Sequence, residues 1–233
     1  MTEVAPPHST APEAKPESTT KMGEPLGPIY DALWQELAWL HKKWTEYVAL
    51  YGTKSSRIDL MNEAAPAFFR IVQDTFWEDV LLHMARLTDS PKSLGKSNLT
   101  FRLLAEYVHD GETKAKVECL TSNAIDGTEF CRDWRNRRIA HQDLRLALEK
   151  KAELLKPASR EKVRKALQAL AAVLNAVSHH YLASTTYFEH ETSAGGAVSL
   201  LYVLQDGVNT AANRRDRLNN GIYDPNDFGP KNV

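Results

Sequence analysis

Apolar side chains recur every three or four residues along most of this chain, and this spacing restricts the fold more than any other feature. Between residues 29 and 51 it places Leu33, Leu37, Leu40, Trp44 and Val48 on one face of a helix. Comparable patterns predict helices over residues 57–87, 101–108, 112–124, 160–188 and 197–218. The spacing of Asp126 and Glu129, which approximates a capping box, predicts that a further helix starts there. Because no useful stretch alternates with the two-residue period of a strand, the pattern predicts an all-α helical bundle.

Changes in composition and the Gly195-Gly196 pair divide the chain into four parts. Residues 1–27 are rich in Pro, Ser, Thr, Ala and Glu and carry almost no large apolar side chain before Leu26, so we expect a disordered tail. Residues 28–192 form the predicted helical bundle. The Gly195-Gly196 pair precedes an additional helix within residues 193–219, and residues 220–233 form a C-terminal tail. Within the bundle, Pro66 is expected to start or kink a helix and Ser159 to cap one.

The composition is that of an ordinary soluble protein. The net charge is −1, with 29 Lys and Arg against 30 Asp and Glu, so any site for a polyanion must be a local patch. The two cysteines give neither a disulfide framework nor a zinc spacing. The N-terminus lacks the features of a signal peptide, and no apolar run approaches the roughly 18 residues that span a bilayer. We therefore expect a cytoplasmic protein with no membrane partner.

The stretch RNRRIAH, residues 135–141, concentrates positive charge in this near-neutral chain. Its three arginines need either nearby carboxylates or a bound anion to offset their repulsion. A purely structural interpretation is available, since Asp133 and Arg137 are four residues apart on a helix and Phe130, Trp134 and Ile139 would face the core. The polar Asn136 beside Arg135 and the surplus of arginine over residues 127–145 favour an anion. Trp134 is a candidate stacking surface for a base, but a core position is commoner for tryptophan.

The spacing of Arg135 and His141 sets a geometric condition on any shared role. Six residues correspond to about 600°, or about 240° after one full turn, so the two side chains do not share a face of one continuous α-helix. Two arrangements would bring them together. Either the helix breaks near Ala140, or a second copy of the chain completes the pair across a two-fold interface.

Three blocks in order resemble a known protein family. They are FWEDVLLHMARLTDSPKS (76–93), NLTFRLLAEYV (98–108) and RDWRNRRIAHQDL (132–144). The last contains Arg135, Asn136 and, after four intervening residues, His141, which is similar to the signature of the HEPN superfamily. The three blocks together resemble its abortive-infection U-type branch over most of residues 30–190.

The resemblance implies a metal-independent endoribonuclease that acts as a homodimer in phage defence or as the toxin of a toxin–antitoxin system. In this role His141 would transfer protons, Arg135 would stabilise the phosphate and Asn136 would orient the reacting groups. The RNA backbone would be contacted by Arg132, Arg137 and Arg138. RNA and a second copy are then the expected partners, an antitoxin or sensor protein is a further candidate, and no cofactor is expected.

Two alternatives stay open at this point. A catalytically inactive HEPN module that binds nucleic acid or a protein partner would have the same fold, because a fold does not certify an activity. The intact Arg-Asn…His set favours the enzyme. A metal site would draw on His179, His180, Glu189, His190 and Glu191, or on Asp79 and His83. Because neither group has a recognised ligand spacing, we expect no metal.

Overall fold

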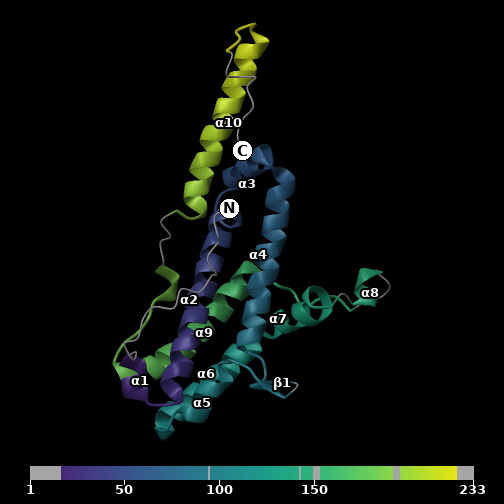
Figure 1. Cartoon of the computed structure of the whole chain (residues 1–233). Helices are drawn as coiled ribbons and strands as arrows, with labels where there is room; N and C mark the ends of the chain where they lie inside the picture. The colour runs from purple at the N-terminus through teal and green to yellow at the C-terminus, as the bar shows by residue number, and fades with distance from the viewer. Residues whose placement is uncertain (1–16, 94, 142, 149–152, 191–194, 225–233) are drawn as a thin grey trace. The chain divides into compact units, whose positions relative to one another are not determined.

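The computed structural model describes residues 17–93, 95–141, 143–148, 153–190 and 195–224. Among these residues the elements are α1 (Glu17–Met22), α2 (Leu26–Tyr51), α3 (Ser55–Ala64), α4 (Pro66–Leu87), β1 (Lys92–Ser93), β2 (Lys96–Ser97), α5 (Arg102–Tyr107), α6 (Gly111–Gly127), α7 (Glu129–Trp134), η1 (Arg135–Ile139), α8 (Leu144–Ala147), α9 (Arg160–Leu182), η2 (Phe188–His190) and α10 (Ala197–Asn219). Figure 1 follows them along the chain, from purple α1 to yellow α10. The predicted all-α class is confirmed, with one small antiparallel hairpin of β1 and β2 added. Within the described residues, no helix combines the length and apolar character needed to cross a membrane.

The chain forms two compact units. The first contains Met1–Glu36, Arg86–Gly127 and Arg164–Thr186, and the second contains Leu37–Ala85, Thr128–Val163 and Tyr187–Val233. The long helices α2, α4 and α9 each contribute residues to both units. The whole RNRRIAH stretch belongs to the second unit.

The start of the first unit corrects one boundary predicted from the sequence. The disordered tail expected over residues 1–27 is wrong for its described part, because residues 17–22 form α1 and α2 begins at Leu26. Met22 and Leu26 are both buried, and the Ser18 hydroxyl donates a hydrogen bond to Asp31 Oδ2 at 2.5 Å. Gly27 allows the backbone of α1 at Thr19 to lie close to α2, since a Cβ at residue 27 would lie 2.5 Å from the Thr19 Cα. Residues 1–16 of the predicted tail, and residues 225–233 of the C-terminal one, lie outside the described residues.

The end of α9 corrects a second prediction. The helix expected over residues 160–188 ends at Leu182, and the chain turns there with Ala183 at a φ of 50°. Asn175 holds the returning segment: its side-chain Oδ1 accepts from the Thr186 N–H at 2.9 Å and its Nδ2 donates to the Thr186 carbonyl at 3.0 Å. The helix start is as predicted, because Ser159 Oγ accepts the Lys162 N–H at 3.2 Å.

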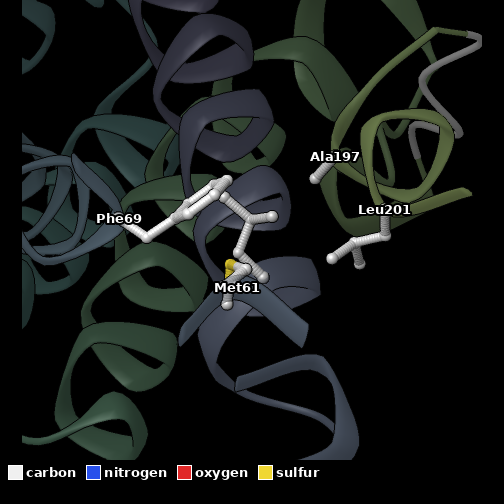
Figure 2. Packing of buried hydrophobic residues seen from close by; sticks show 5 residues of the cluster. Met61, Phe69, Ala197 and Leu201 are labelled. Carbon is white, nitrogen blue, oxygen red and sulfur yellow. The ribbon is translucent and has the colours of Figure 1, made fainter. Parts of the chain in front are cut away.

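A small apolar cluster in the second unit attaches the last helix. Its buried members are Leu50, Met61, Phe69, Ala197 and Leu201. Figure 2 shows Ala197 and Leu201 of α10 pointing toward Met61 of α3. Pro66 opens α4, as the sequence predicts, and Glu46 Oε2 accepts the Ala197 N–H at 2.5 Å at the first turn of α10. A helix expected after the glycine pair is thus confirmed as Ala197–Asn219.

The aromatic side chains of α2 and α4 divide between two environments. Trp44 and Phe69 are buried, and Trp77 lies within 6.3 Å of the Trp44 ring centroid. Trp39 and Phe68, by contrast, are 50% and 59% exposed. The sequence spacing therefore identified the helices but not which of their aromatic residues point inward.

Candidate functional site

The RNRRIAH stretch lies where a helix changes its winding and then ends. The α-helix α7 continues directly into η1, a π-helical turn over Arg135–Ile139. The Ala140 N–H donates to the Arg135 carbonyl at 2.8 Å, the i to i+5 bond of such a turn, and Ala140 and His141 form a bend. The helix break near Ala140, which one of the two arrangements predicted from the spacing requires, is confirmed. π-turns occur frequently at functional sites.

Arg135 and Asn136 contact each other directly on this turn. Arg135 Nε donates a hydrogen bond to Asn136 Oδ1 at 2.9 Å. The Arg135 side chain is half-buried, whereas Asn136 is exposed. Because Nε is held by this bond, the plane of the guanidinium group is oriented by its neighbour.

His141 occupies the bend between η1 and α8 and is exposed. Its ring makes no hydrogen bond to any residue in the described part of the chain. The residues that follow anchor the bend. The Asp143 N–H donates to the Arg137 carbonyl at 3.0 Å, and the Asp143 carboxylate accepts the Leu146 N–H at 3.0 Å as the cap of α8. This last bond holds the pKa of the Asp143 carboxyl below its usual value.

Arg137 is engaged by the protein itself. Its Nη1 lies 3.5 Å from Asp133 Oδ1, which confirms the expected pair at four residues' separation, and 3.5 Å from the Leu154 carbonyl oxygen. Its Nη2 donates to the Glu153 carbonyl. The side chains of Arg137 and Asp133 are only 20% and 16% exposed, so the pair is largely withdrawn from water.

The other two arginines predicted to contact RNA also have partners within the chain. Arg138 Nε lies 3.4 Å from Glu78 Oε1, and its guanidinium carbon is 5.5 Å from the centroid of the Trp134 ring. Arg132 Nη1 donates to Thr128 Oγ1 at 3.3 Å. The exposed Arg138–Glu78 pair is of a kind that contributes little to stability and exchanges readily for another anion.

Trp134 serves a structural purpose in this unit. Its indole Nε1 donates to the Lys156 carbonyl at 2.9 Å, and its ring meets the Trp77 ring edge to face at a centroid distance of 6.4 Å. The indole is therefore held by groups of the protein on its edge and by an aromatic neighbour.

A segment that the sequence did not single out crosses this helix end. We call residues 153–157 the strap. The Lys156 N–H donates to Asp133 Oδ2 at 2.7 Å, and Lys156 Nζ lies 2.5 Å from Glu129 Oε1. The bond to Lys156 lowers the pKa of the Glu129 carboxyl. Most of these contacts use the backbone N–H and carbonyl groups of the strap. The residue types of the strap therefore do not indicate the contacts in the sequence.

The described residues offer no cluster of three or more His, Cys, Asp or Glu that would hold a metal ion. The candidate ligands have other neighbours: Asp79 Oδ2 lies 2.5 Å from Lys43 Nζ, and His180 Nδ1 lies 3.0 Å from Thr113 Oγ1. Glu191 lies outside the described residues. Burial raises the pKa of the Cys131 thiol to about 12, which removes it as a nucleophile near neutral pH.

Comparison with known proteins gives a family match. The HEPN family model described as AbiU2 matches residues 23–199. The match covers α2 through η2 and the first residues of α10, and it includes the RNRRIAH stretch. No curated protein and no solved structure matches the chain.

Proposed function

The chain belongs to the HEPN AbiU2 family, and on that premise we propose that this abortive-infection module is a metal-independent endoribonuclease, used in phage defence or as a toxin. The family resemblance inferred from the three sequence blocks is confirmed by the match over residues 23–199. The nuclease activity, the RNA substrate and the dimeric site are our proposals. They rest on the residues of η1 and the bend after it.

The observation that carries the proposal is the π-turn that ends at the bend of His141. Cleaving RNA without a metal needs a group that moves protons near neutral pH and a cation that opposes charge developing on the phosphate. An exposed imidazole at His141 supplies the first and the Arg135 guanidinium the second. Asn136 Oδ1 holds the Arg135 guanidinium in one plane. The RNA backbone contacts proposed for Arg132 and Arg138 would need these side chains to exchange their present partners for phosphate.

Exposed leucines beside the motif support a dimeric site. Leu144 and Leu148 are four residues apart at α8 and are 71% and 54% exposed, and Leu154 of the strap is 85% exposed. Large apolar side chains grouped at the surface mark interaction sites more often than scattered ones do. A second copy that covers these leucines across a two-fold axis would bring its own Arg135 and His141 to the same place.

One observation favours the second candidate, an inactive HEPN module that binds a protein partner. All three arginines predicted to contact RNA already bind groups of their own chain. If these contacts persist in solution, the segment offers less cationic surface to a polyanion than its sequence indicates.

The test is cleavage of a single-stranded RNA in the presence of EDTA. We expect the wild-type protein to cleave and His141→Ala to lose about 10²–10⁴-fold in rate, the contribution of a general acid or base. His109→Ala is the matched control, since His109 is also an exposed histidine but lies outside the motif. Equal background cleavage in wild type and His141→Ala would support the binding module instead.

Mixing two inactive variants tests whether two copies build the site. If Arg135 and His141 act from different copies, a mixed dimer of Arg135→Ala with His141→Ala regains one site with both groups intact. Activity then returns on mixing, and solution mass shows a dimer. If both groups act from one chain, mixing restores nothing although each variant still forms dimers.

A further inference from the structure

We propose that Arg137 is a positioning residue, which ties the strap and the His141 bend to the π-turn, and that it does not contact RNA. This inference rests on the proposed nuclease function for its kinetic consequence, but its structural part stands on the contacts of Arg137 alone. The sequence offered Arg137, Arg138 and Arg132 as equivalent cations, and the structure distinguishes them.

The guanidinium group of Arg137 contacts three acceptors of its own chain. It meets the Asp133 carboxylate and two strap carbonyls, those of Glu153 and Leu154. The Arg137 side chain is only 20% exposed. A phosphate that bound it would have to displace these acceptors and would leave the Asp133 charge half-buried and without its partner. Arg138 is 53% exposed and has one carboxylate contact at 3.4 Å, so it faces a smaller penalty.

Asp133 binds the strap at a second point, Lys156, and we call Arg137 and Asp133 together the clamp. One of its oxygens faces Arg137 and the other accepts the Lys156 N–H at 2.7 Å. The strap is therefore held at its first two residues by Arg137 and at Lys156 by Asp133. The four-residue spacing of Asp133 and Arg137 puts both on one face of the helix end.

The backbone of Arg137 connects this clamp to the proposed catalytic histidine. Its carbonyl accepts the Asp143 N–H at 3.0 Å, two residues beyond His141. The side chain thus fixes the π-turn against the strap while the carbonyl of the same residue closes the bend. Loosening the guanidinium contacts should shift His141 relative to Arg135, and displacements on the order of 1 Å cost roughly 10²-fold in rate.

The experiment compares Arg137→Lys with Arg145→Lys, an exposed arginine of α8 outside the clamp. Lysine keeps the charge but lacks the planar fork that reaches three acceptors. We expect Arg137→Lys to lower kcat roughly tenfold or more, with little change in KM or in the salt dependence of binding. We expect Arg145→Lys to behave as wild type. If Arg137 instead contacts phosphate, KM rises, kcat is retained and the salt dependence changes, which would overturn the proposal.

Amide hydrogen exchange gives a readout that does not need activity. In Arg137→Lys the Lys156 and Asp143 amides, which bond to Asp133 and to the Arg137 carbonyl, should exchange roughly threefold to tenfold faster. Asp133→Asn keeps an acceptor for the Lys156 N–H. It should nevertheless speed up exchange of the Asp143 amide if Asp133 and Arg137 act together. Unchanged exchange at both amides sinks the proposal. If wild type cleaves no RNA, the proposed function fails, while the exchange arm still decides whether Arg137 holds the strap and the bend.

Discussion

Truncation of Leu201 tests how the last helix is held. Leu201 is 7% exposed and lies in the cluster with Met61 and Phe69, so it is a principal apolar contact of α10 with α3. The family match ends at residue 199, so α10 lies almost entirely outside it. Leu201→Ala therefore probes an element that the family pattern does not describe.

The expected loss follows from the atoms removed. Leu→Ala deletes three buried carbons, worth about 0.8 kcal/mol each, or about 2.4 kcal/mol in all. A dry cavity would add to this, up to about 5 kcal/mol. The contact borders a groove of about 310 Å³ lined by Leu204, Val208 and Ala64, so water and neighbouring side chains fill the space left. We therefore expect a loss of about 2–3 kcal/mol.

Amide hydrogen exchange along α10 measures this loss as the free energy of helix opening. The control is Tyr202→Ala, the next residue on the same helix, whose side chain is 71% exposed. It should change the opening free energy by less than about 0.5 kcal/mol. Equal losses of opening free energy in the two variants, or a larger loss in Tyr202→Ala, would refute the conclusion that α10 is held by the cluster around Met61.

Two further predictions concern the cysteines and a helix cap. In the native protein iodoacetamide should modify the exposed Cys119 and spare Cys131 until denaturant is added, because burial keeps the Cys131 thiol protonated. Since the folded pKa of Cys131 is raised from 9.0 to about 12, its contribution to stability is complete below pH 9 and is lost as the pH rises toward 12, which alkaline denaturation would show. Ser159→Ala removes the acceptor of the Lys162 N–H and should cost about 1 kcal/mol in urea unfolding. Ser199→Ala, on an exposed position of α10, should cost much less.

Helices are the part of this fold that the sequence predicts best, because apolar spacing reports a local periodicity. The stripe of α2, the start of α4 at Pro66 and the separate α10 were all predicted in this way. One of the missed elements is α1, which has too few apolar residues to show a period. Tertiary contacts stabilise this helix: Met22 is buried, and the backbone at Thr19 packs closely against Gly27.

The site was predictable to the same extent and for the same reason. The Asp133–Arg137 pair and the break near Ala140 follow from positions along one helix. The partners of Arg137 in the strap do not, because they are backbone carbonyls 16 and 17 residues away, and every residue type has a carbonyl. Spacing identified the charged residues, and only their contacts distinguish the largely buried Arg137 from the exposed Arg138.

The π-turn removes the geometric reason for requiring a second copy. One continuous α-helix from Arg135 to His141 would place the two side chains about 240° apart. The chain instead winds more widely over Arg135–Ile139 and then bends, so the angle no longer forbids contact within one chain. The exposed leucines at α8 are then the main structural support for a dimer. Complementation between Arg135→Ala and His141→Ala separates a second copy that supplies a catalytic group from one that only covers the leucines, since both form dimers but only the first restores cleavage on mixing.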